Sequence, residues 1–307
     1  MNLISLAKEY GFAEAYVFPA EPFPHYERRL QDGALHPSGR RLISDVRQAA
    51  PWANAIVALL RPYRPFPPDV PLSGFYLSSN AGYHAAKALL GRLQDEGAEA
   101  ATADVPVREL LLRGGVGIPL KNGLTAIEPY GTRYSVQTLA AALPEPVRYT
   151  AAPPQKPPHC RTCHACEKAC PSGAIDAGGF HFGACARAYM SGDTMGEWVM
   201  DAMATMLGCE LCQNVCPYNR LILPQGELPE AFALERLLGG DDKPALALVG
   251  VNLKKNGRLQ QHACVMAAKL GRKDLLPLIR ELADDPREAV RAAARYALGR
   301  LGKTTDV

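Results

Sequence analysis

The chain has 307 residues, of which 48% are hydrophobic and 21% are charged, as in a globular protein with a substantial apolar core. No apolar run is long enough to cross a bilayer, and charged residues at positions 8, 9 and 14 lie where a secretory signal would be apolar, so we expect neither a membrane protein nor an exported one. The net charge of +3 is uneven, because residues 243–307 carry thirteen Lys and Arg against six Asp and Glu, which is +7 and leaves −4 for the rest. A polyanionic partner is therefore expected at the C-terminal end.

Residues 1–152 are predicted to form a mixed α/β domain. Residues 53–60 are a short apolar run suited to a buried strand. Residues 82–96 carry apolar side chains at helical spacing, and residues 106–113 predict a second helix that stops at a pair of glycines. The proline-rich stretch of residues 153–158 is expected to be a linker to the next domain.

Eight of the nine cysteines lie within 57 residues. The first run is Cys160-x2-Cys163-x2-Cys166-x3-Cys170-Pro171, the second is Cys209-x2-Cys212-x3-Cys216-Pro217, and Cys185 stands between them. Three thiolates two residues apart can wrap one 4Fe–4S cluster, and a fourth that lies three residues further on, before a proline, serves a second cluster. Residues 153–228 are therefore predicted to form a ferredoxin-like domain with two 4Fe–4S clusters.

The spacing also suggests how the ligands divide. The first cluster is expected to use Cys160, Cys163, Cys166 and Cys216, and the second Cys170, Cys185, Cys209 and Cys212. Cys185 is the candidate for the third close cysteine that the short second run lacks. Zinc and disulfides are the alternatives, but zinc sites favour paired Cys-x2-Cys ligands and disulfide frameworks are typical of small secreted chains. The ninth cysteine, Cys264, lies among alanines and is expected to be a buried apolar thiol.

Residues 229–307 are predicted to be helical. Residues 275–282 and 289–299 flank a turn that contains two aspartates and a proline, which is the pattern of one helix pair of a HEAT-like repeat. Residues 262–271 look like the end of the unit before it. Such helix pairs stack into curved binding surfaces. The alternative is a simple helical cap over the cluster domain.

Beyond the cysteine runs, the chain carries several short motifs. They are Arg47-x3-Pro51, Tyr83-His84, Pro106-Val107-x-Glu109, Gly115-Val116-Gly117-x3-Lys121-Asn122-x-Leu124, Tyr130-Gly131-Thr132, Gln213-x-Val215-Cys216-Pro217-Tyr218-Asn219 and Ala297-Leu298-Gly299. These motifs and the order of the parts resemble the epoxyqueuosine reductases, cobalamin-dependent enzymes that perform the last step of queuosine synthesis in tRNA. The resemblance covers nearly the whole chain and implies an α+β fold: a nitroreductase-like α/β cobalamin domain, the two-cluster domain and the HEAT-like domain.

The resemblance also implies cofactors and their contacts. The α/β domain would hold a cobalamin, and the two clusters would feed electrons to it one at a time. Candidate cofactor-binding residues are Lys121, Asn122, Tyr130, Thr132 and Gln213. Two interpretations of Asn122 stay open, because its amide can donate and accept hydrogen bonds to a phosphate or to the corrin amides, or can only cap its turn.

The catalytic acid is where this chain departs from the family pattern. The family has an aspartate three residues before the proline of the Pro-Val-x-Glu motif, and that position here is Ala103. We expect a one-residue shift in the loop to make Asp104 the proton donor, with its carboxyl facing a closed, largely apolar cavity. The alternatives are another donor or the loss of this chemistry.

The expected partners are tRNA that carries the modified base and an electron donor such as a flavodoxin or ferredoxin. Arg291 and Arg295 are candidates for contact with the RNA, and a solvated helix face is the alternative. The protein is expected to be a cytoplasmic monomer. Two other functions compete: an electron-transfer protein that holds the clusters alone, and a corrinoid reductase of another small electrophile such as an organohalide.

Overall fold

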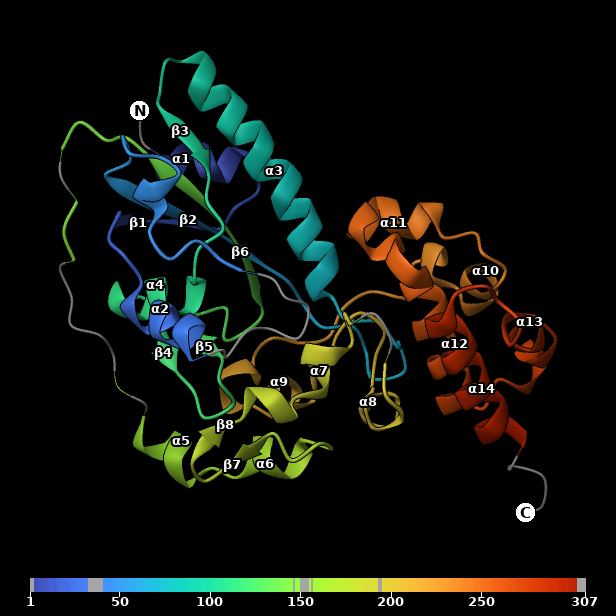
Figure 1. Ribbon diagram of the computed structural model, residues 1–307. Helices are drawn as coiled ribbons and strands as arrows, with labels where there is room; N and C mark the ends of the chain where they lie inside the picture. Colours follow the sequence, from blue (N-terminus) through green and yellow to red (C-terminus); the bar gives the residue numbers. More distant parts are fainter. Residues whose placement is uncertain are drawn as a thin grey trace.

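The computed structural model describes residues 3–32, 41–145, 147–149, 155, 157–192 and 195–302. Figure 1 shows a sheet domain, a small cysteine-rich domain beneath it, and a helical domain beside both that leads to the C-terminus. Three of the six residues of the linker predicted at 153–158 lie outside the described residues, namely 153, 154 and 156. In the part of the chain that the structure describes, no helix is both long enough and apolar enough to span a membrane.

The first domain is built on a four-stranded antiparallel sheet with the order β1-β2-β6-β3. Its strands are β1 (Glu14–Pro19), β2 (Ala55–Pro62), β3 (Ala100–Thr102) and β6 (Tyr134–Ala141). In the register of the central strands, Val57 pairs with Val17 on one side and with Leu139 on the other. Strand β2 confirms the buried strand predicted at residues 53–60, since its first six residues are buried.

Both faces of the sheet are covered, so the side chains of β2 alternate between two cores. Val57 and Leu59 pack with buried residues of α1 (Leu3–Glu9) and α3 (Phe75–Asp95). Ile56 and Leu60 point the other way and pack with α4 (Val107–Arg113). Helices α3 and α4 confirm the helices predicted at residues 82–96 and 106–113. This domain also holds α2 (Pro24–Gln31), η1 (Val46–Gln48), β4 (Ile118–Pro119) and β5 (Thr125–Ala126).

The cysteine-rich domain consists of short elements joined by turns. They are α5 (Pro158–Thr162), α6 (Ala165–Ala169), β7 (Ile175–Asp176), β8 (Gly179–Phe180), η2 (Phe182–Ala184), α7 (Ala186–Tyr189), α8 (Glu197–Ala202), α9 (Leu211–Asn214) and η3 (Pro217–Asn219). Helices this short are not stable alone, so packing or bound groups must hold them.

The helical domain confirms the predicted helix pair. Helix α13 (Leu276–Leu282) and α14 (Glu288–Gly302) lie where the pair was expected. Cys264 is fully buried in α12, as predicted, and burial raises the pKa of its thiol to about 12. The other elements are η4 (Glu230–Phe232), α10 (Leu234–Leu238), α11 (Lys243–Val249), η5 (Val251–Gly257), α12 (Arg258–Lys269) and η6 (Lys273–Leu275).

The core of the helical domain extends into the cysteine-rich domain. Met195, Val199 and Met203 share one apolar cluster with Phe232 and Val265. The boundary predicted between residues 228 and 229 therefore separates two stretches of sequence whose side chains pack together.

Candidate metal centres

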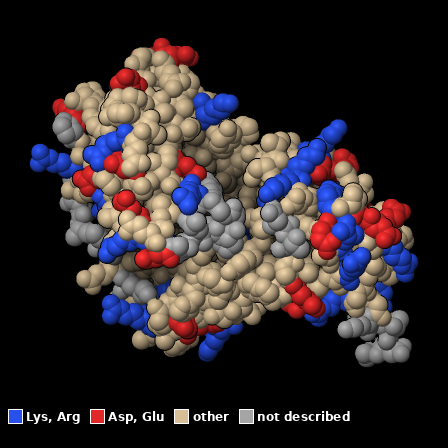
Figure 2. All heavy atoms as spheres, viewed as in Figure 1, with Lys and Arg blue, Asp and Glu red and all other residues tan. Residues whose placement is uncertain are grey.

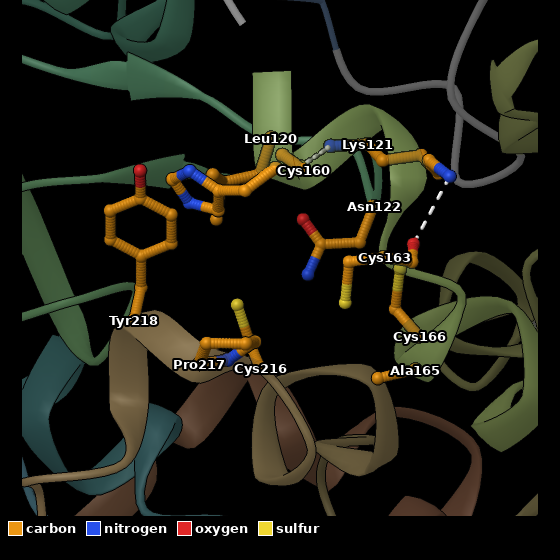
Figure 3. A pocket seen from close by; sticks show the side chains of 11 residues that line it. Leu120, Lys121, Asn122, Cys160, Cys163, Ala165, Cys166, Cys216, Pro217 and Tyr218 are labelled. Carbon is orange, nitrogen blue, oxygen red and sulfur yellow. Dashed lines mark hydrogen bonds between the residues drawn. The ribbon is translucent and has the colours of Figure 1, made fainter. Parts of the chain in front are cut away.

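Four cysteines surround one cavity at the junction of the α/β and cysteine-rich domains (Figure 3). They are Cys160, Cys163, Cys166 and Cys216, the set predicted for the first cluster. The cavity encloses about 350 Å³ between the lining atoms, part of it open to solvent. We call it the first sulfur site. The sequence prediction and the geometry thus agree on which cysteines lie together here.

The local fold explains how these thiols converge. Cys160, Cys163 and Cys166 lie on α5, α6 and the turn between them, and Cys216 comes directly before η3, whose first residue is a proline. The backbone N–H of Lys121 lies 3.3 Å from the sulfur of Cys160, in position to donate a hydrogen bond. Burial raises the pKa of the Cys166 and Cys216 thiols, so a metal must displace their protons for the sulfurs to become thiolates.

The other four cysteines form a second sulfur site. Cys170, Cys185, Cys209 and Cys212 are the set predicted for the second cluster, and their thiols are close enough to influence one another electrostatically. Burial raises the pKa of the Cys212 thiol to about 12. The backbone N–H of Ala174 lies 3.3 Å from the sulfur of Cys170. Lone Cys185 thus joins the second run in space.

The arrangement suits a cluster better than a single ion. Among the described residues, no three His, Cys, Asp or Glu side chains converge on a point where one metal ion could bind. Four sulfurs around one zinc ion would lie within about 4 Å of each other, because Zn–S bonds are about 2.3 Å long. The sulfurs of the first site instead line a cavity (Figure 3), which leaves room for a larger group held at its corners by cysteine thiolates.

A buried lysine attaches the first site to the α/β domain. The Lys121 side chain is only 2% exposed, and its Nζ lies 2.5 Å from Glu167 Oε1. The same ammonium donates to the backbone oxygens of Arg161 and Cys163, at 2.8 and 3.1 Å. All three acceptors lie in the loop that carries the first cysteine run. Lys121 therefore holds that loop against the turn after β4.

A buried arginine attaches the second site in the same way. Arg133, just before β6, pairs with Glu210, which stands between Cys209 and Cys212, and also donates to Asn214. Both partners of the ion pair are almost fully buried. Ser73 Oγ donates to the other oxygen of Glu210 at 2.7 Å. This pair was not among the predicted site residues; the signal for it in the sequence is an acidic residue between two predicted ligands, which needs a cation if it is buried.

A buried histidine links the second site to the helical domain. The backbone N–H of Leu207 donates to His262 Nδ1 at 3.0 Å, and His262 Nε2 lies 3.2 Å from the backbone oxygen of Met190. Burial lowers the pKa of His262 to about 4, so the ring is neutral near pH 7. A neutral ring with its proton on Nε2 satisfies both contacts. Helix α12 thereby positions the loop that leads to Cys209.

The residues predicted for cofactor contact mostly join the two domains. Lys121 and Asn122 line the first sulfur site. Thr132 Oγ1 donates to Gln213 Oε1 at 2.9 Å. Tyr130 donates to Glu14 at 3.1 Å instead. If these residues contacted a cobalamin through the same polar atoms, their present hydrogen bonds would have to break.

Asp104 and Ala103 lie on opposite sides of the chain after β3. Ala103 is buried in the core, and its N–H donates to the Thr138 oxygen at 3.0 Å. Asp104 is exposed, and its backbone oxygen accepts from the N–H of Ile43 at 2.8 Å. The alternation of an extended chain explains this difference. The closed apolar surroundings expected for Asp104 are not seen.

The two arginines predicted to bind RNA differ in their surroundings. Arg291 donates to the backbone oxygens of Asp285 and Pro286 and pairs with Glu288. Arg295 is exposed. Acidic and basic side chains are intermixed over the helical domain on the face seen in Figure 2. Arg295 is thus more accessible to a polyanion than Arg291.

Two family models match parts of the chain. A 4Fe–4S double cluster binding domain matches residues 159–219, and HEAT repeats match residues 251–307. The predictions of a two-cluster 4Fe–4S domain and of a HEAT-like C-terminal domain are thereby confirmed. The class of the protein follows: an α+β iron–sulfur protein with a double-cluster domain and C-terminal HEAT repeats.

Comparisons over longer stretches point to one group of enzymes. The epoxyqueuosine reductase of Bacillus cereus is 24% identical across 98% of this chain and 88% of its own length. That of Listeria monocytogenes is 28% identical across 65% of this chain, a match that spans 54% of the relative. A solved epoxyqueuosine reductase with an epoxyqueuosine-modified tRNA-Tyr stem loop superposes with a TM-score of 0.76, at 22% identity, over 98% of this chain and 89% of that chain. The chain is therefore a homologue of epoxyqueuosine reductases in sequence and shares their fold.

Proposed function

We propose that the protein is an oxidoreductase that reduces epoxyqueuosine in tRNA to queuosine, with two 4Fe–4S clusters and a cobalamin. One observation carries the proposal: two sites of four cysteines each pack against an α/β domain in a chain homologous to epoxyqueuosine reductases over 98% of its length. The tRNA stem loop held by the solved homologue supports tRNA as the partner.

The cysteines are proposed as cluster ligands in two groups. Cys160, Cys163, Cys166 and Cys216 would hold the first cluster, and Cys170, Cys185, Cys209 and Cys212 the second. When bound, the clusters supply electrons one at a time at low potential, which no side chain can do. The chain excludes water from part of each site and donates backbone N–H groups to the Cys160 and Cys170 sulfurs. These donors stabilise the negative charge of the sulfurs.

Cobalamin is proposed from the sequence similarity. Three of the residues predicted to hold it, Lys121, Thr132 and Gln213, make hydrogen bonds at the junction of the α/β and cysteine-rich domains. The described side chains thus fit the clusters as they stand, and contacts to a corrin would need these hydrogen bonds to be exchanged.

Opening an epoxide requires a proton for the departing oxygen, and we propose that Asp104 supplies it. Asp104 lies at the end of β3 in the α/β domain, one residue after the position of the family's acid. Its side chain is exposed, so a substrate bound at this edge of the α/β domain can reach its carboxyl.

We also propose residues that contact tRNA, an electron donor and a cellular location. Arg295 would contribute to tRNA binding, with Arg291 as a weaker contributor because its guanidinium is already bonded. A flavodoxin or ferredoxin would supply the electrons. Oxygen-sensitive clusters and free cysteines favour the cytoplasm as the location and would be protected there.

The absorption spectrum of anaerobically purified protein, with and without added cobalamin, tests the cofactor set. We expect the broad iron–sulfur absorption together with a corrinoid spectrum that stays with the protein through gel filtration. Clusters without retained cobalamin would contradict the proposal and favour an electron-transfer protein. An activity assay of the same protein with an organohalide as substrate tests whether it is instead a reductase of another small electrophile.

A further inference from the structure

The turn at residues 120–124 carries a buried polar group with no partner. Asn122 is only 3% exposed, and its Nδ2 is a buried atom without a hydrogen-bond partner among the described residues. A buried N–H group left unsatisfied is costly, and the great majority of buried polar groups in native proteins have a hydrogen-bond partner. The question is what the amide of Asn122 faces.

The orientation of this amide is fixed by its other end. Asn122 Oδ1 accepts a hydrogen bond from the backbone N–H of Leu124 at 3.2 Å. Exchanging the oxygen and nitrogen would place an NH₂ group against an N–H donor, so the flipped amide is excluded. Nδ2 must therefore point away from Leu124. Figure 3 shows it directed into the first sulfur site, towards the space between Cys163 and Cys216.

The turn itself is held in place from several sides. Gly123 has a φ of +78°, and an added Cβ there would lie 2.5 Å from the Phe180 ring, so the turn packs against β8. Lys121 contributes its backbone N–H to Cys160 at 3.3 Å and its ammonium to the first cysteine loop. Two successive residues thus direct N–H groups at one site, and the turn is too constrained for Asn122 to move away.

From this geometry we propose that the side-chain amide of Asn122 donates a hydrogen bond to the first 4Fe–4S cluster and raises its reduction potential. The inference rests on the proposed ligand set of the first cluster and adds a residue that nothing in the cysteine pattern assigns. The acceptor is a sulfur of the cluster or of its thiolates. Reduction adds one negative charge to the cluster, so the hydrogen bond stabilises the reduced form more than the oxidised form.

The second sulfur site provides an internal control. The 120–124 turn lines the first site, whereas Cys209 of the second site packs against the helical core and directly precedes Glu210, the partner of Arg133. Removal of the Asn122 amide should shift one cluster potential and leave the other unchanged. A general loosening of the fold would shift both.

The test is a redox titration followed by electron paramagnetic resonance on the full chain, purified anaerobically without substrate. Asn122→Asp keeps the size of the side chain and its acceptor for Leu124 but has no N–H; Asn122→Leu removes both polar atoms. We expect both variants to keep their iron and to show a more negative potential for one cluster only. Loss of one hydrogen bond to a charged acceptor should lower the reduced-to-oxidised ratio at a given potential about tenfold, which corresponds to about 59 mV for one electron.

The outcomes separate this inference from the proposed function, because no turnover is measured. Unchanged potentials in both variants, or equal shifts of both clusters, would overturn it while leaving the ligand set intact. If Asn122→Leu loses iron, Asn122→Ala takes its place, because it removes both polar atoms without bulk, whereas the added charge of Asn122→Asp lowers the potential by itself. Loss of the first cluster from both variants would overturn the inference and show that Asn122 is needed for assembly of the first cluster.

Discussion

The two sulfur sites use the same ligands but are enclosed in different ways. The first lies beneath a polar turn of the α/β domain, where Lys121 and Asn122 line a cavity open in part to solvent. In the second site, burial raises the pKa of the Cys212 thiol to about 12, and Cys209 packs against the apolar core of the helical domain. Potentials depend on solvent exposure and on hydrogen bonds to sulfur, so two clusters of one type can differ in potential. The first site should be tuned by polar groups, and the second by burial.

Each site is also attached to the α/β domain by one buried cation. Lys121 reaches Glu167 and two backbone oxygens, whereas the guanidinium of Arg133 reaches Glu210 and Asn214. Lys121 retains acceptors if its carboxylate partner is removed. Arg133 would keep only neutral partners, the side chains of Asn214 and Tyr63, and its ion pair is the more deeply buried of the two. The attachments should therefore differ in how much they stabilise the protein.

The largest effect is expected from Cys185→Ala. This change removes a proposed ligand of the second site only, so the variant should lose close to half of its iron and all turnover while the first cluster stays. Cys264→Ala, which alters a buried thiol outside both sites, should lose no iron. Iron analysis and electron paramagnetic resonance of the two variants check this. Equal iron contents would remove Cys185 from the ligand set.

Asp104→Asn tests whether epoxide reduction can be lost while both sulfur sites stay intact. The substitution keeps the size of the side chain and removes the acid, so we expect the rate of epoxide reduction to fall by roughly 10²–10⁴-fold, the usual contribution of a general acid. Iron content and cluster potentials should not change. Single-turnover kinetics measure the rate. Full activity would assign the proton to water or to another side chain.

Because the two buried cations have different partners, we expect Glu210→Gln and Glu167→Gln to differ in how much they destabilise the protein. Glu210→Gln leaves an enclosed guanidinium without its counter-ion, and breaking such a pair costs about 3–5 kcal/mol. Glu167→Gln should cost less, because two backbone carbonyls still accept hydrogen bonds from Lys121. Thermal unfolding of the cluster-loaded variants measures both. A larger loss for Glu167→Gln would reverse the comparison.

Acidification should weaken the second site through His262. Its pKa is about 4 in the folded protein and near 6.5 in an unfolded chain, so the unfolded state takes up the proton first as the pH falls. The stability due to the neutral ring is complete above pH 6.5 and is lost between pH 6.5 and 4, by about 2 kcal/mol at pH 5. His262→Gln cannot titrate there and is the control. Parallel losses of stability in the two proteins between pH 7 and 5 would contradict this account.

The sequence predicted the parts whose signal is local. Cysteine spacing within each run predicts a two-cluster domain because the close ligands of a cluster lie a few residues apart, and the helix pair around Asp285 follows from its own periodicity. The role of the turn at Lys121 and Asn122 could not be predicted. Its partner Glu167 lies 46 residues away, and Arg133 and Glu210 are 77 residues apart. A glycine-rich turn indicates a bend in the chain but not what the bend will contact.

The surroundings of Asp104 could not be predicted from the sequence either. Its exposure follows from the alternation after β3, which places Ala103 in the core. The alternation could be predicted from sequence, but the surroundings of the exposed side could not, because they depend on elements distant in the chain.

The central claim is tested most directly by turnover on the proposed substrate. Anaerobic protein loaded with both clusters and cobalamin is incubated with a low-potential reductant and a tRNA stem loop that carries epoxyqueuosine, and the nucleosides are analysed by mass spectrometry. The account predicts conversion to queuosine, seen as the loss of one oxygen atom, and no conversion by Cys185→Ala. Unchanged epoxyqueuosine in the presence of fully loaded protein would contradict it.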